Sequence, residues 1–228
     1  MESIRTSEGR VVQLPILSVT GQITKQSTLF LRESGSTIHA VLRPSAIHTL
    51  FEIDARTLSN KAAPLSSLCP DHRAALDLES ALLATEDNEE RLALLTEFLV
   101  SHWENRRPSD PMVEKCLAII DREIRHIRLT SLLERLGISE RQLERRFLRT
   151  VGIAPKQYIR IRRVNEALRM METGSFDSLT DVAFALNYFD QSHFIRDIRE
   201  FSGTNPRSLT QKVRDFQHDR VGTSFLLE

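Results

Sequence analysis

Arginine side chains are concentrated in one short part of this sequence. Between Arg141 and Arg169, nine Lys and Arg residues stand against two acidic residues. A guanidinium donates hydrogen bonds in a planar fork that fits phosphate oxygens or the edge of a guanine base. Such a run is also common on a solvated helix surface, so the spacing of the surrounding residues has to distinguish the two interpretations.

The residues around this run form a unit that occurs twice. "LGISERQLERRFLRTVGIAP", residues 136–155, and "LNYFDQSHFIRDIREFSGTNP", residues 186–206, share one skeleton, with an offset of 50 residues before the inserted Phe189 and 51 after it. Gly137 and Asn187 take the place in each copy where a helix ends in a residue that tolerates left-handed backbone angles. The pattern predicts two helix-turn-helix units.

The second helix of each unit is predicted to begin at a capping residue and to have one polar face. Ser139 and Asp190 stand at the capping positions. At about 100° per residue, an apolar stripe through Leu143 and Phe147 turns Arg141 and Arg145 outward. In the second copy, a stripe through Phe194 and Ile198 does the same for the corresponding positions. The candidate DNA-contacting residues are Ser139, Arg141, Glu144, Arg145, Arg146, Gln191, Ser192, Ile195 and Arg196.

These outward side chains have the chemistry needed to read duplex DNA. An α-helix fits the major groove, where Arg pairs with guanine, Gln with adenine, and an apolar group such as Ile195 touches a thymine methyl. Glu144 could accept from cytosine or orient the neighbouring arginines, and Ser139 could cap its helix or reach a phosphate. Other basic residues are expected to hold the DNA backbone, namely Arg146, Arg149, Arg160 and Arg163. The alternative for Arg141 and Arg145 is surface charge paired with Glu140 and Glu144.

The elements that position these residues divide the chain in two. The linker "ENRRPSDP" contains Asp110 and Pro111, which are predicted to cap and start a helix. Before it, short strand patterns and two helical stretches, residues 71–84 and 89–103, indicate an α+β domain. After it only helical periodicity remains, and Pro155 is expected to open a long helix that joins the two units and ends near Gly174. We therefore predict an α+β domain at 1–107, an all-α double helix-turn-helix domain at 108–216 and a tail at 217–228.

Several further expectations follow from composition. Residues 1–111 carry 11 Lys+Arg against 15 Asp+Glu, and the remainder carries 20 against 16, so the positive charge lies in the second half. Cys69 and Cys116 lack metal-ligand spacing, and we predict no disulfide, metal or cofactor. The absence of a long apolar run and of a signal-like start predicts a cytoplasmic protein. The stripe of Leu92, Leu95, Leu99 and His102 or Trp103 is expected to face a core, with a dimer seam as the alternative.

The second half resembles the AraC/XylS family of bacterial transcription regulators. The resemblance extends over about residues 112–213 and is carried by "LTDVAFALNYFDQSHFIRDIREFSGTNPRSL", which is similar to the family pattern A-x-x-x-G-[FY]-x-[DS]-x-S-[HY]-F-x-R-x-[FI]-[KR]-x-x-x-G-x-[TS]-P. Asn187 replaces the usual glycine, and Asp197 and Glu200 make the second recognition helix less basic than the family pattern. The resemblance implies two recognition helices in successive segments of the major groove, with base contacts at Arg141, Glu144, Arg145, Gln191, Ser192, Ile195 and Arg196.

The resemblance also implies partners. "AVLRPSAIHTLFEIDARTLSNKAAPLSSL", residues 40–68, is similar to the N-terminal regions of some family members, which sense a small molecule or mediate dimerisation. We therefore expect a transcription regulator that binds double-stranded DNA, with an effector in the first domain, a homodimer and, for an activator, RNA polymerase as candidate partners. Two other functions stay open: a helical protein-protein adaptor, and a DNA-alkyl-transfer regulator that uses Cys69. No serine-elbow, P-loop or paired-carboxylate motif supports an enzyme.

Overall fold

The computed structural model describes residues 3–5, 9–25, 27–30, 37–104, 106, 109–174, 176 and 178–203. The chain divides into two compact units. The first unit comprises residues 1–23, 27–113 and 145–153, and the second comprises residues 24–26, 114–144 and 154–228. The predicted boundary at residue 107 remains a prediction. Pro206, which closes the second repeat, and the tail at 217–228 lie outside the described residues.

The N-terminal strands are short and form two small antiparallel sheets. Strands β1 (Ser3–Arg5), β2 (Val11–Gln13) and β4 (Thr28–Phe30) make one sheet in the order β2-β1-β4. Strands β3 (Ser18–Thr20) and β5 (Ala62–Pro64) make the other, with Val19 opposite Ala63. The β-branched segments seen in the sequence therefore do form strands, each of three residues. The molecule is mostly helical, with only a small N-terminal sheet component.

The helices of the first unit enclose an apolar core. They are α1 (Ala46–Phe51), the 3-10 helix η1 (Ala55–Leu58), α2 (Leu65–Leu68), α3 (His72–Ala84) and α4 (Asn88–Glu104). The last two match the helical stretches expected from periodicity. Leu50, Phe51 and Leu78 are among the buried core residues, and Leu95 and Leu99 of α4 pack against them. Leu92 was expected to face inward, but it is 55% exposed, so the inner stripe of α4 is shorter than predicted.

The described residues from 109 to 203 contain helices and turns only. The helices are α5 (Pro111–Glu123), α6 (Leu129–Leu136), α7 (Glu140–Val151), α8 (Pro155–Glu172), α9 (Leu179–Ala185) and α10 (Gln191–Ser202). Asp110 caps α5 as predicted, because its Oδ1 accepts hydrogen bonds from the backbone N–H groups of Met112 and Val113 at 3.0 and 3.4 Å. Pro155 opens α8, and Gly174 lies beyond its end with φ of 64°.

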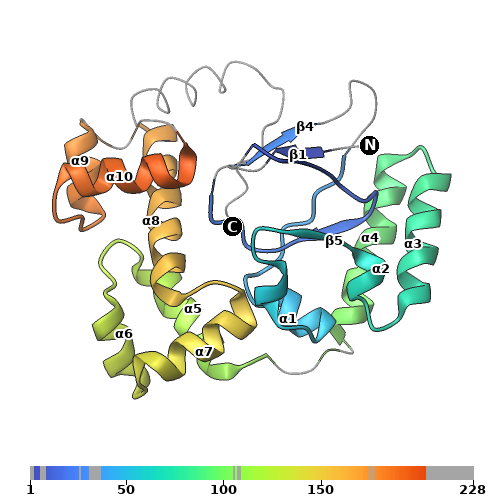
Figure 1. Cartoon of the computed structure of the whole chain (residues 1–228), viewed down its shortest axis with the longest axis horizontal. Helices are drawn as coiled ribbons and strands as arrows, with labels where there is room; N and C mark the ends of the chain where they lie inside the picture. The colour runs from blue at the N-terminus through green and yellow to red at the C-terminus, as the bar shows by residue number, and fades with distance from the viewer. Residues whose placement is uncertain are drawn as a thin grey trace. The chain divides into compact units, whose positions relative to one another are not determined.

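Helix α8 is the support on which α9 and α10 pack (Figure 1). Its apolar residues Val164, Leu168 and Met171 join a buried cluster with residues of α9 and α10, including Val182 and Phe194. Burial of each apolar side chain of this size contributes roughly 1.5–3 kcal/mol to stability. Apolar packing therefore holds α9 and α10 against α8. None of the helices in the described ranges is both long and apolar enough to cross a membrane.

Candidate nucleic-acid interface

The first helix-turn-helix unit has the turn and the cap that its sequence predicts. Gly137 ends α6 with φ of 64°, and its N–H donates to the carbonyls of Leu133 and Glu134. Ser139 and Gln142 then form a reciprocal pair at the start of α7: the Gln142 N–H donates to Ser139 Oγ at 3.3 Å, and the Ser139 N–H donates to Gln142 Oε1 at 3.1 Å. This capping box satisfies two backbone donors and sets where α7 begins.

Helix α7 separates its residues into a buried and an exposed face. Leu143 and Phe147 are fully buried. Arg141, Glu144 and Arg145 are exposed, as their position opposite the apolar stripe predicts. Within the described part of the chain, neither guanidinium has a hydrogen-bond or ion-pair partner, so the expected alternative of pairing with Glu140 and Glu144 is not found. The two arginines keep all their donors available for a ligand.

Other arginines of the basic run have partners within the protein. Arg146 Nη1 lies 3.1 Å from Asp110 Oδ1, although its side chain remains 45% exposed. Arg163 donates to the backbone carbonyls of Ile124 and Ile127, and burial lowers its pKa. Arg160 forms ion pairs with Asp197 and Glu200. Arg160 and Arg163 thus already bridge elements of the protein, and a contact of either residue with a DNA backbone remains a prediction.

The second unit has the same plan, although its turn is built from different residues. Asn187 adopts φ of 56°, so it supports the left-handed turn without a glycine. Tyr188 is buried in the α8–α10 core, and Asp190 Oδ1 accepts a hydrogen bond from the His193 N–H at 2.7 Å to cap α10. The His193 side chain is half exposed and lies edge-on to the Tyr188 ring.

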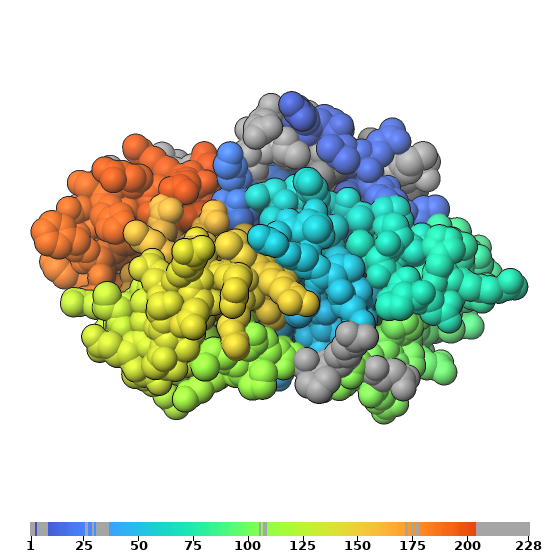
Figure 2. All heavy atoms as spheres, turned by 60° about the horizontal axis from the view of Figure 1, so that its bottom comes forward, coloured from blue at the N-terminus to red at the C-terminus, as the bar shows by residue number. Residues whose placement is uncertain are grey.

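The residues predicted to contact DNA from α10 are placed in two ways. Three of them are exposed in the N-terminal half of α10, namely Gln191, Ser192 and Arg196. The surface formed by α9 and α10 is orange in Figure 2. Ile195 is only partly accessible because it packs against the apolar cluster. Three of the four predicted side chains are thus free to reach a ligand, and Ile195 presents only part of its surface.

Asp197 faces the interior of the second unit rather than its surface. Arg160 Nη2 donates to its Oδ1 at 2.7 Å, and the Tyr188 hydroxyl donates to its Oδ2 at 3.3 Å. The hydrogen bonds of Asp197 raise the pKa of Arg160. Burial, followed by the Asp197 charge, raises the pKa of Tyr188. The acidic residue that makes α10 less basic in sequence is therefore a structural partner of Arg160 and does not face the predicted DNA surface.

Cys69 is held in an environment that suppresses its reactivity. Its Sγ lies 3.1 Å from His102 Nε2, and His102 Nδ1 lies 2.9 Å from the Phe98 carbonyl oxygen. Because the Nδ1–H donates to that carbonyl, Nε2 is the acceptor and the thiol is the donor. Burial raises the pKa of Cys69, and this shift favours the thiol over the nucleophilic thiolate. The structure thus disfavours the alkyl-transfer alternative, and no cluster of three potential metal ligands occurs among the described residues.

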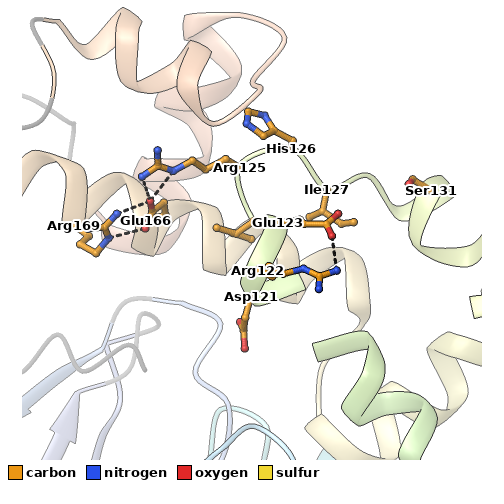
Figure 3. A pocket seen from close by; sticks show the side chains of 10 residues that line it. Asp121, Arg122, Glu123, Arg125, His126, Ile127, Ser131, Glu166 and Arg169 are labelled. Carbon is orange, nitrogen blue, oxygen red and sulfur yellow. Dashed lines mark hydrogen bonds and ion pairs between the residues drawn. The ribbon is translucent and has the colours of Figure 1, made fainter. Parts of the chain in front are cut away.

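A hollow of about 630 Å³ lies between α5, α6 and α8 in the second unit. Figure 3 shows that Arg125 and Arg169 approach Glu166 from different elements. Their nearest nitrogens lie 2.7 and 2.8 Å from its carboxylate, and the Arg169 and Arg125 hydrogen bonds lower the pKa of Glu166. Hydrogen bonds from Arg135 and Arg122 likewise lower the pKa of Glu123 to about 2. The carboxylates of Glu123 and Glu166 in this hollow are therefore paired with arginines of the protein itself.

Comparisons with known proteins agree with the double helix-turn-helix geometry. Residues 132–212 match the family model described as "Helix-turn-helix domain". The HTH-type transcriptional regulator YbfI of Bacillus subtilis (strain 168), uncharacterized, is 30% identical over 112 residues, covering 46% of this chain and 40% of that protein. The HTH-type transcriptional activator RhaS of Pectobacterium carotovorum subsp. carotovorum (strain PC1) is 33% identical over 83 residues, covering 36% of this chain and 29% of that protein.

Solved structures give a weaker likeness. A transcriptional regulator with an AraC-type DNA-binding domain from Chromobacterium violaceum has a TM-score of 0.42 at 23% identity, covering 45% of this chain and 92% of that chain. ToxT from Vibrio cholerae O395 has a TM-score of 0.46 at 14% identity, covering 93% of this chain and 85% of that chain. These scores are too low to establish a shared arrangement of the whole chain.

The matched segment is a helix-turn-helix domain of the kind found in HTH-type transcriptional regulators. Residues 132–212 lie within the part of the sequence that resembles the AraC/XylS family, so the helix-turn-helix match agrees with that resemblance. Both matched relatives are described as HTH-type transcriptional regulators or activators. The chain covers between 29% and 40% of the length of these relatives.

Proposed function

We propose that this protein is a sequence-specific transcription regulator that reads the major groove with α7 and α10. The observation that carries the proposal is the pair Arg141 and Arg145, which are exposed on α7 and have no partner in the described part of the chain. Arginine pairs bidentately with guanine, and the N-terminal residues of a recognition helix are those that reach base edges.

The remaining contacts divide by chemistry. Glu144 lies between the two arginines in sequence and can accept from cytosine, whereas Gln191 can pair with adenine. Ser192 and Arg196 extend this surface along α10, and Ile195 offers a thymine the part of its side chain that is not packed. Contacts to phosphate fall to Ser139, at the exposed start of α7, and to Arg146, which would have to share its guanidinium with Asp110.

The partners of such a regulator follow from its class. This proposal includes a cytoplasmic location, an effector bound by the first unit and a homodimer. For an activator, it also includes contact with RNA polymerase. The hollow beside Glu166 is not offered as the effector site, because its charges are paired with one another.

The test is selection of bound duplexes from a random DNA pool, followed by titration of the selected site. Arg141→Ala and Arg145→Ala are each expected to weaken binding by about 5-fold to 150-fold, the equivalent of about 1–3 kcal/mol per bidentate contact. Arg73→Ala removes an equally charged, exposed arginine of α3 and should bind as the parent does.

The salt dependence separates regulator from adaptor. Binding through several phosphates weakens steeply between about 50 and 200 mM salt. If no duplex is enriched, or if both arginine variants bind the selected site as tightly as the parent, the proposed reading surface is wrong. Capture of a protein by a salt-insensitive contact would instead favour the adaptor.

A further inference from the structure

Phe189 is an aromatic side chain left in solvent at the start of the second recognition helix. It is 91% exposed, more than any other large hydrophobic residue in the described part of the chain. It is also the residue inserted into the second repeat, with no counterpart in the turn of the first. The Phe189 ring therefore contributes little burial to its own fold, and its apolar surface is available to a ligand.

The local backbone places Phe189 beside the predicted DNA surface. Asn187 turns the chain with φ of 56°, and Tyr188 then enters the core. Asp190 turns back to cap α10. Phe189 therefore stands between the buried Tyr188 and the helix cap Asp190, two residues before the exposed Gln191. Residues at this end of a recognition helix approach base edges.

The charge of this end of α10 also favours an apolar contact. Asp197 is buried against Arg160, so Arg196 is the one basic side chain among the predicted contacts of α10. The Asp190 carboxylate would be repelled by a phosphate. An apolar group in the major groove can recognise the thymine methyl, which is absent from the other bases.

We propose that Phe189 is a further specificity-determining residue, which contacts a thymine methyl group in the segment of DNA read by α10. This inference rests on the proposed function and extends it to a residue outside the predicted contacts. It assigns different chemistry to the two units: the first reads through exposed arginines, and the second relies on apolar contact next to Gln191 and Ser192.

The experiment uses the full chain and the duplex selected from a random pool. Each thymine of the selected site is replaced in turn by deoxyuridine, which removes only the methyl group. At one thymine of the α10 segment, this replacement should weaken parent binding by about fourfold, from about 0.8 kcal/mol for burial of one methyl-sized group. Phe189→Ser should lower the affinity for the thymine site to a similar or greater extent and abolish the difference between thymine and deoxyuridine.

Two matched variants sharpen the result. Phe184→Ser removes the other strongly exposed aromatic of this unit, which is 70% exposed on α9, and should leave the methyl dependence unchanged. Phe189→Leu should retain part of the difference in affinity between the thymine and deoxyuridine sites. The effect of Phe189→Ser should also be the same at low and high salt, since an apolar contact releases no counterions.

The outcomes separate this inference from the proposed function. If the parent binds its selected site and no thymine of the α10 segment shows a methyl effect, or if Phe189→Ser retains that effect, Phe189 does not read the methyl group and the regulator assignment stands. If the parent enriches no duplex, both fail. Loss of the methyl effect in Phe184→Ser and not in Phe189→Ser would also overturn the assignment of Phe189.

Discussion

At the scale of single residues, the second unit depends on one buried carboxylate. The Asp197 side chain is 2% exposed and holds Arg160 and the Tyr188 hydroxyl. Removal of one member of a buried hydrogen-bonded pair leaves the other without its partner, which costs more than the net value of the pair. Glu200 contacts the same guanidinium from the surface, so the two acids allow a direct comparison.

We expect Asp197→Asn to lower the free energy of unfolding by about 1–3 kcal/mol, because Arg160 and Tyr188 lose the charged acceptor between them. Glu200→Gln should cost less than about 1 kcal/mol, as for other exposed pairs. Urea unfolding followed by circular dichroism measures both. Equal losses in the two variants would show that burial of the Asp197 pair has no special weight.

At the scale of elements, the turn between α7 and α8 depends on a glycine in close contact with the loop around η1. Gly152 has φ of 98°, and a Cβ at this position would lie 2.9 Å from the carbonyl oxygen of Ala55. The hydroxyl of Ser59 donates to the carbonyl of Gly152 at 2.5 Å. Residues 145–153 accordingly belong to the same compact unit as the N-terminal segments. The end of the first recognition helix is thereby tied to that unit.

This geometry predicts that Gly152→Ala destabilises the protein more than Gly137→Ala. Both positions have positive φ, but a Cβ at Gly137 meets nothing within 4 Å, so that variant pays only the backbone penalty of about 1–2 kcal/mol. Gly152→Ala should lose a similar amount of stability from its backbone conformation, and its Cβ must also displace the Ala55 carbonyl. The two urea midpoints provide the measurement. A midpoint for Gly152→Ala at or above that of Gly137→Ala would mean that the contact with Ala55 is not maintained in solution.

At the scale of the whole molecule, α8 sets the reach of the two reading helices. It has 18 residues. At 1.5 Å per residue it is about 27 Å long, comparable with the rise of roughly 34 Å for one turn of DNA. A single chain that uses both units should therefore need its two recognition segments at one fixed spacing.

We expect insertion of five base pairs between the two segments of the selected site to reduce affinity to that of one segment, because the insertion rotates them by about half a turn. The same insertion outside the site is the control and should have no effect. Titration by fluorescence anisotropy measures the two duplexes. Unchanged affinity after the internal insertion would indicate that only one unit contacts DNA.

The pattern of residue types was enough to predict the helices from α3 to α10, the two left-handed turns and the caps. These features depend on neighbours in the chain: Gly137, Asn187, Ser139 and Asp190 act within a few residues of their own positions. The outward direction of Arg141 and Arg145 also follows from helical periodicity alone. For the same reason, local motifs were enough to predict the helix-turn-helix domain that the family model matches.

Only the tertiary structure decided which charges are available. Arg160 lies 37 residues from Asp197 along the chain, and Arg163 meets carbonyls nearly 40 residues away, so no local pattern shows that both are engaged within the protein. For the same reason, the exposure of Leu92 was predicted wrongly, and the partial burial of Ile195 was not anticipated. The burial of a side chain depends on which neighbouring element covers that face of its helix. The sequence did not predict the exposure of Phe189 either. It showed only that Phe189 is an additional residue in the second repeat. Charge pairing and burial are properties of residues brought together by folding, and periodicity along one helix does not contain them.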